Sequence, residues 1–125
     1  MYQVSVHACG HQVEGDNDGI RHARLIVRVT DSNGNPVKGI AQRDFTIYSD
    51  KGGYFGEESI RFFDECNATF PATHLPGVYY IDTNWVHAYR GSFIFAVAVR
   101  HRDGDTLQTG QGLATLIKQV GNHDA

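Results

Sequence analysis

Apolar and polar residues alternate at every second position through most of this chain. The opening segment YQVSVHA shows the pattern, because Tyr2, Val4 and Val6 alternate with polar neighbours. No window keeps apolar residues at the third and fourth positions that an amphipathic helix requires. A period of two instead places successive side chains on opposite faces of a strand. The sequence therefore predicts an all-β fold with little or no helix.

Turn residues divide the alternating pattern into short strands. The segment VTDSNGNPVKG at 29–39 ends a strand, because Asn and Gly accept positive φ and Pro36 has no amide hydrogen. Asp103 and Gly104 predict the central residues of a hairpin turn. The segment SFIFAVAVR at 92–100 is apolar on both faces, which predicts a central strand covered on both sides or lying under another chain. Strands are predicted at 2–9, 24–30, 43–48, 60–63, 78–82, 92–100 and 107–120.

Size and charge restrict the class of protein. At 125 residues and 13.9 kDa the chain fits a single domain, 1–125, with one hydrophobic core. Its formal net charge is −3 and its 11 basic residues are scattered, so we expect no nucleic-acid partner. The longest apolar run is far shorter than the ~20 residues of a membrane-spanning helix. No signal peptide is visible, which makes the cytoplasm the default expectation, with export by a non-classical route as the alternative.

Three segments carry a resemblance to a known family. These are the strand and D-x-x-G-x-P-V turn within LIVRVTDSNGNPVKGIAQRDFTIYSDKGG at 25–53, the Pro-Gly entry of LPGVYYIDTN at 75–84, and RGSFIFAVAV at 90–99. Together they resemble bacterial immunoglobulin-like domains of the invasin type. The resemblance implies an immunoglobulin-like antiparallel β-sandwich of seven to eight strands. Its core would span 24–120, and 1–23 would form an additional strand and loop.

The resemblance also suggests how the core is built. Val29 and Phe45 are expected to face it from adjacent strands, and Val37 with Ile40 is expected to plug one end of the sandwich. It says little about function, because this fold hosts adhesins, chaperones, carbohydrate binders and spacers alike.

A group of histidines and a cysteine near the N-terminus is the first candidate site. His7, Cys9 and His11 are spaced two residues apart, so on a strand they share one face, and His22 is a possible fourth ligand. Imidazole and thiolate bind transition metals such as zinc, copper or nickel. The alternative is an exposed polar strand face, and a bulge at Gly10 would destroy the alignment. We expect no cofactor, with a transition metal as the alternative.

Aromatic residues in two predicted loops, one among glycines at 52–56 and one before the strand at 92–100, form the second candidate site. Such side chains offer a large contact area at low entropic cost, which is typical of patches that bind a protein or a glycan. The alternative is structural, with Trp85 capping the core and Tyr89 bonded to a corner. The candidate patch comprises Tyr54, Phe55, Trp85, His87, Tyr89 and Arg90.

Catalysis has no support in the sequence. It contains no G-x-S-x-G, H-E-x-x-H, P-loop or G-x-G-x-x-G pattern. The tetrapeptide Tyr89–Ser92 is identical to the one that ends the transthyretin-like hydroxyisourate hydrolases, but here it lies inside the chain, and we interpret it as a coincidence. Cys9 and Cys66 are too few for a disulfide framework, and whether they are bridged is left open.

The sequence therefore predicts a non-catalytic module that contacts a protein partner through its loops or an edge strand. That partner could be a second copy of the chain, because exposed sheet edges favour pairing. A transition-metal protein and a carbohydrate-binding module are the two alternatives.

Overall fold

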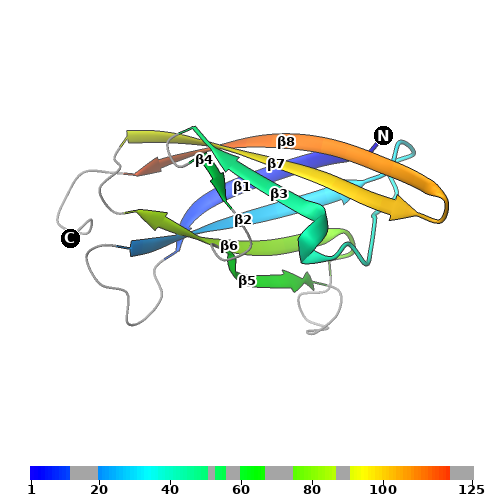
Figure 1. Ribbon diagram of the computed structural model, residues 1–125, viewed down its shortest axis with the longest axis horizontal. Helices are drawn as coiled ribbons and strands as arrows, with labels where there is room; N and C mark the ends of the chain where they lie inside the picture. The colour runs from blue at the N-terminus through cyan, green and yellow to red at the C-terminus, as the bar shows by residue number, and fades with distance from the viewer. Residues whose placement is uncertain (12–19, 51–52, 56–59, 67–74, 87–90, 119–125) are drawn as a thin grey trace.

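The protein is a sandwich of two antiparallel β-sheets, as the computed structural model shows (Figure 1). The structure describes residues 1–11, 20–50, 53–55, 60–66, 75–86 and 91–118. At 10–11, 20–22, 53–55, 61–62, 84–86, 91–93 and 117–118 it describes the backbone alone. One sheet has the strand order β1-β2-β6-β5 and the other β4-β3-β7-β8. The strands are β1 (Gln3–His11), β2 (Ile20–Thr30), β3 (Phe45–Ser49), β4 (Gly53–Phe55), β5 (Ile60–Glu65), β6 (Val78–Val86), β7 (Gly91–Asp103) and β8 (Thr106–Lys118).

The strand order confirms the predicted fold class. Strands 1, 2, 6 and 5 share one sheet while 3, 7 and 8 share the other, which is the distribution found in immunoglobulin-like sandwiches. In the described part of the chain, the regular structure outside the strands is a single 3-10 turn, η1 (Gln42–Asp44), and helical backbone at Cys66, where the described range ends. The alternating pattern thus gave the correct class because each sheet buries one face.

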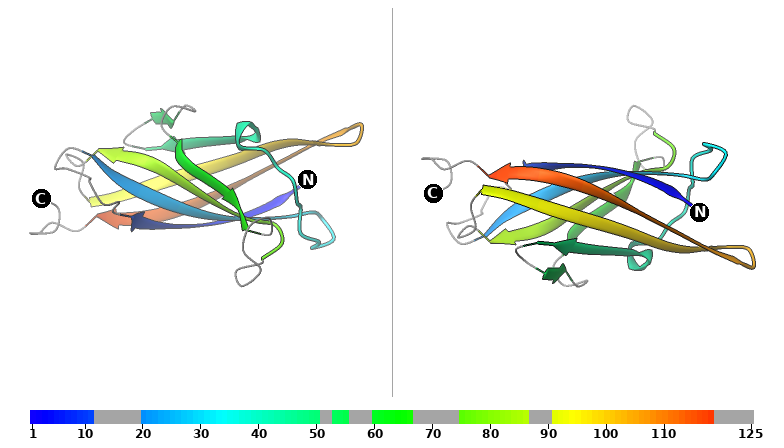
Figure 2. Two further views of the ribbon diagram at one scale, coloured as in Figure 1. Left: turned by 90° about the horizontal axis from the view of Figure 1, so that it is seen from below. Right: turned by 90° about the horizontal axis from the view of Figure 1, so that it is seen from above.

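The N-terminal strand is an integral part of the first sheet. β1 pairs with β2 in continuous register from Gln3 opposite Thr30 to His11 opposite His22. It also lies beside β8 of the other sheet (Figure 2), where the Tyr2 amide donates a hydrogen bond to the Thr109 carbonyl at 2.8 Å. The segment that the resemblance treated as an addition therefore joins the two sheets along one edge.

Glycine on β8 makes this close approach possible. A Cβ added to Gly112 would lie 2.5 Å from the Val4 carbonyl oxygen, and one added to Gly110 would lie 2.6 Å from that of Tyr2. Neither separation is sterically allowed, so any side chain at these two positions would force β1 away from β8. The sandwich is closed at this edge because β8 carries no side chains there.

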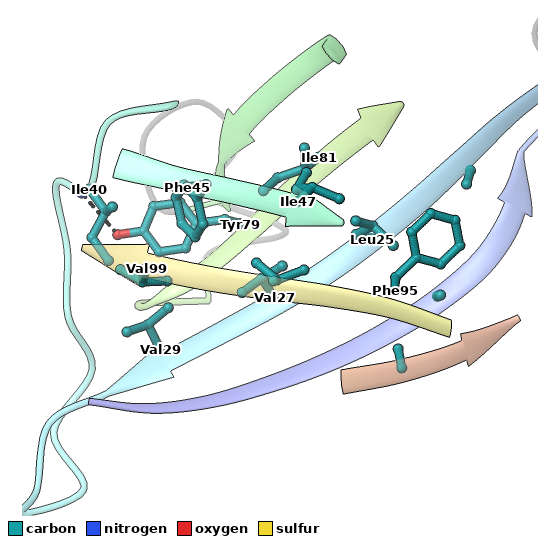
Figure 3. Packing of buried hydrophobic residues seen from close by; sticks show 14 of the residues in the cluster. Leu25, Val27, Val29, Ile40, Phe45, Ile47, Tyr79, Ile81, Phe95 and Val99 are labelled. Carbon is teal, nitrogen blue, oxygen red and sulfur yellow. Dashed lines mark hydrogen bonds between the residues drawn. The ribbon is translucent and has the colours of Figure 1, made fainter. Parts of the chain in front are cut away.

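The core fills the space between the sheets (Figure 3). Inward-facing side chains of both sheets meet there, and an aromatic group of Phe45, Phe63 and Tyr79 lies towards one end, with ring centroids 5.2 to 5.9 Å apart. Such separations suit edge-on and offset ring packing. The largest fully buried side chains are Tyr79, Phe95, Leu25, Ile40, Ile47, Ile81, Val27, Val29, Val97 and Val99.

Tyr79 anchors the segment that crosses the end of the sandwich. Its buried hydroxyl accepts a hydrogen bond from the Ile40 amide at 3.2 Å (Figure 3). The same hydroxyl donates to the Val37 carbonyl at 2.7 Å. Glu65 accepts a hydrogen bond from the Gly39 amide nearby. Ile40 is buried and Val37 packs against the core, which confirms that these two residues plug this end.

The turn after β2 is held by the carboxylate of Asp31. This carboxylate accepts hydrogen bonds from the amides of Asn33 and Asn35, both at 2.9 Å, and Gly34 has a φ of 86°. An Asx turn with glycine at the left-handed position is the structure that the Asp-Ser-Asn-Gly-Asn sequence favours. Pro36 then forms an isolated bridge with Thr30, so the chain folds back along β2.

Several predicted boundaries are wrong. Gly104 and Asp105, rather than Asp103 and Gly104, are the central residues of the β7–β8 turn, and Gly104 has the positive φ of 63°. The short strand β4 was predicted as loop, and β6 extends four residues beyond its predicted end at Asp82. Tertiary pairing extends these segments, which local sequence signals do not reveal.

Val29 and Phe45 are both buried, but not on adjacent strands of one sheet. Val29 belongs to β2 and Phe45 to β3, and these strands lie in opposite sheets. The chain crosses from one layer to the other between them, so the two side chains face the same core from opposite sides.

Candidate functional site

The outer face of the β4-β3-β7-β8 sheet exposes large apolar side chains. Tyr48 on β3, Ile94 on β7 and Leu113 on β8 are 49%, 45% and 63% exposed. The strand register places Tyr48 opposite Ala96 and Ala96 opposite Leu113, so Tyr48, Ala96 and Leu113 form one row across three strands. Ile94 lies two residues before Ala96 on β7. The view from above in Figure 2 shows this sheet in front of the other. A sheet face with such a row presents apolar area to water, which is a feature of interaction surfaces.

Small side chains hollow this face beside the exposed row. Ala98 lies between Thr46 on β3 and Gln111 on β8, and it forms part of the floor of a depression of about 570 Å³. Tyr48 stands on the border of the depression, and the first two residues of the chain complete it next to Gly110. The same face therefore carries a protruding row and a hollow side by side.

Opposite charges lie at the two ends of this face. Exposed Asp50 follows β3 and accepts a hydrogen bond from the Ile94 amide at 2.9 Å, which fixes it at one end. Exposed Arg100 lies at the other end, opposite Thr109. Between them the described outward positions on β3, β7 and β8 carry no charge.

The outer face of the β1-β2-β6-β5 sheet is instead built around an ion pair. Arg24 on β2 lies opposite Asp82 on β6, and its guanidinium binds the carboxylate through two hydrogen bonds, at 2.8 and 2.9 Å. Asp82 is buried, and the guanidinium also lies over the Tyr80 ring, 5.4 Å from its centroid. The hydrogen bond to Asp82 raises the pKa of the Arg24 guanidinium above its usual value.

The two cysteines are free and far apart in this sheet. Cys9 lies on β1 and Cys66 follows β5, at opposite edges of four strands. Three strand spacings of about 4.8 Å separate them by roughly 14 Å, which is too far for a disulfide. Burial raises the pKa of the Cys66 thiol, so this group is a poor nucleophile at neutral pH.

The predicted metal ligands lie on two neighbouring strands. His7 is exposed and Cys9 is half-buried on the outer face of β1, and the Cys9 thiol lies 3.8 Å from the Arg24 carbonyl oxygen. His11 and His22 occupy directly opposite register positions on β1 and β2, and Gly10 pairs with Ala23 without a bulge. Among side chains that the structure describes, no three His, Cys, Asp or Glu groups are clustered for a metal. The structure describes the backbone alone for His11 and His22.

The predicted aromatic patch is divided between the two sheets. Tyr54 and Phe55 belong to β4 and Trp85 to β6, so the expectation that these three residues lie in loops is wrong. Tyr54 pairs with Tyr48, and Trp85 pairs with Arg21. The other three candidates, His87, Tyr89 and Arg90, lie outside the described residues. The apolar row on the second sheet was missed as a site, although the two-faced apolar pattern of 92–100 was its signal.

No family model, curated protein or solved structure matches this chain. In the part of the chain that the structure describes, there is no helix of the length and apolarity needed to cross a membrane.

Proposed function

We propose that this protein is a non-catalytic, immunoglobulin-like interaction module that docks a second copy of itself. The observation that carries the proposal is the uncharged outer face of β3, β7 and β8, with Tyr48, Ile94 and Leu113 exposed in its centre. Burial of such a face against an apolar surface is favourable at about 25 cal/mol per Å² of apolar area. The kinship with bacterial immunoglobulin-like domains is a proposal that rests on the turn and strand segments of the sequence.

A binding role is favoured over catalysis by how the described polar groups are used. Arg24 with Asp82, and Asp44 with His101 at 3.0 Å, join neighbouring elements of the sandwich. The Tyr79 hydroxyl and Glu65 hold the segment that crosses the end of the core. These groups are engaged in maintaining the fold.

A second copy fits this face because the face is self-complementary. In a dimer with its two-fold axis in the plane of the face and perpendicular to the strands, each strand runs antiparallel to its counterpart. Asp50 of one copy would then approach the end of the partner that carries Arg100. Because this rotation places each strand over its counterpart, the protruding Leu113 of each copy would face Gln111 on β8 of the other, which lines the same hollow as Ala98. Charge and shape are therefore both satisfied by the same rotation.

The size of the face indicates a weak dimer. Three strands over about six residues cover roughly 15 Å by 20 Å. A standard interface buries about 800 Å² on each partner, so the roughly 300 Å² outline of this face is well below that size. We expect reversible association, with an average mass that rises with protein concentration.

The test is the solution mass of matched variants measured by sedimentation or light scattering over a concentration series. Leu113→Lys places a charge in the centre of the face and should give a monomer throughout, with an unchanged circular dichroism spectrum. Leu75→Lys is the control, because Leu75 is a similarly exposed leucine outside the strands. The proposal fails if the unaltered protein stays monomeric at the highest concentration, or if both variants have the same effect.

The carbohydrate alternative has less support than docking of a second copy. Its residues, Tyr54, Trp85 and Tyr89, have no described side chains, and two of them belong to different sheets. No observation in the described part of the chain favours a sugar over a protein surface.

A further inference from the structure

The register of β1 against β2 places three potential metal ligands at one end of the first sheet. His11 lies directly opposite His22, and Cys9 lies two residues before His11 on the same strand. Ala8 and Ala23 are buried in the core, so strand alternation assigns Cys9, His11 and His22 to the opposite, outer face. This second strand supplies the converging segment that a metal site on a single strand lacks.

The pairing also fixes the spacing. Directly opposite residues of an antiparallel pair have Cβ atoms about 5 Å apart, and residues two apart along a strand are separated by about 7 Å. Three ligands at such positions can surround one ion while a fourth coordination position stays open. The pairing continues through Gly10 without a bulge, so position 11 keeps the alternation of positions 7 and 9.

His7 does not belong to this set. It lies opposite Ile26 and four residues before His11, which places it about 14 Å from His11 along the strand. His7 lies on the same strand as His11 and at a position of the same alternation. It therefore serves as an internal control for His11 and His22.

We propose that Cys9, His11 and His22 bind one divalent transition-metal ion of the zinc class. One thiolate and two imidazoles form a donor set that suits a borderline-soft ion in tetrahedral coordination. The fourth position is open to water or to a small anionic ligand. This inference is carried by the β1–β2 register and does not depend on the self-association proposed above.

The charges around the site are compatible with a bound cation. Arg24 lies opposite Cys9, but both of its hydrogen bonds to Asp82 direct the guanidinium towards β6 and neutralise it there. The Cys9 thiol contacts the backbone carbonyl oxygen of Arg24 at 3.8 Å. Because the ligands must be deprotonated, metal affinity should fall as the pH is lowered.

The experiment uses the full chain, purified without a histidine tag, stripped with a chelator and titrated with Co²⁺. We expect one ion per chain and a sulfur-to-cobalt charge-transfer band. Cys9→Ser should abolish that band, and His22→Asn should weaken binding by at least about tenfold. The matched control His7→Asn should leave both the affinity and the spectrum unchanged. Far-ultraviolet circular dichroism of each metal-free variant verifies that the fold is intact.

Three outcomes would overturn the inference. One is the absence of a stoichiometric Co²⁺ site in the unaltered protein. The second is binding that His7→Asn weakens as much as His22→Asn, which would indicate diffuse coordination by some of the seven histidines of the chain. The third is a stoichiometric complex whose spectrum does not change in Cys9→Ser. None of these results bears on the mass measurements that test the dimer.

Discussion

The outer faces of the two sheets differ although both come from alternating strands. On the first sheet the central outward residues are Arg24 and Asp82, joined in a bidentate ion pair. On the second sheet they are Tyr48, Ala96 and Leu113, which expose apolar surface. Arg24 and Asp82 satisfy each other's charge within the chain, whereas the second face leaves apolar area exposed. This difference is the basis for assigning the docking role to the second face.

The largest expected effect comes from breaking the ion pair of the first face. Arg24→Ala leaves the buried carboxylate of Asp82 without its bidentate partner, and we expect a loss of about 3 kcal/mol in the free energy of unfolding. Urea denaturation in the presence of a chelator measures it. Arg28→Ala, an exposed arginine on the same strand, is the control and should change stability by less than about 0.5 kcal/mol. Equal losses in the two variants would show that the first face does not depend on this pair.

The second prediction concerns alkaline pH. Burial raises the pKa values of the Cys66 thiol and the Tyr79 hydroxyl, so the folded protein retains these protons where the unfolded chain, with ordinary values of 9.0 and 10.0, releases them. Stability is therefore complete below about pH 9 and falls as the pH rises above it. Urea midpoints measured from about pH 8 to about pH 11 should record this decline.

Two substitutions separate the contributions to that decline. Cys66→Ala should remove the part that begins near pH 9, because it deletes the more acidic of the two groups. Tyr79→Phe should reduce the part that begins near pH 10, to which the Tyr2 hydroxyl also contributes because burial raises its pKa. This variant also loses the hydrogen bonds to Val37 and Ile40. Stability that is constant across this range would contradict the burial of both groups.

The smallest effect is expected on the second face. Ile94→Thr keeps a β-branched residue on β7 and removes apolar area that is already exposed, so the dilute monomer should change in stability by less than about 0.5 kcal/mol. Thermal unfolding at low protein concentration measures it. A loss comparable with that of Arg24→Ala would mean that this face is covered by the chain itself, and the contrast between the faces would disappear.

The fold class was predictable from the sequence because it depends on local patterns. Alternation in segments such as 2–8 and 25–30 identified strands with one buried face, and the Asp-Ser-Asn-Gly-Asn-Pro turn was recognisable from the backbone preferences of its residues. The apolar run at 92–100 correctly indicated a central strand. Its outward residues Ile94, Ala96 and Ala98 also gave the only sequence signal for the exposed face.

The candidate sites were predicted less well because they depend on which strands become neighbours. The pairing of Arg24 with Asp82 joins residues 58 positions apart, and no local pattern connects them. Trp85 was expected in a loop but lies in β6, since pairing with β2 extends that strand. The continuous pairing through Gly10 likewise could not be read from composition, because glycine is equally compatible with a bulge.

The amino-acid sequence by itself determined that the chain folds into strands, where most of them turn, and which side chains enter the core. These properties follow from backbone preferences and from a two-residue period, and both act over a few positions. Only the tertiary structure decided that β1 closes the sandwich against the glycines of β8, that His11 lies opposite His22 in the register, and that one outer face carries an ion pair and the other an apolar row. The physical reason is that strand order and register are set by contacts between distant segments, and those contacts form only when the two sheets pack together.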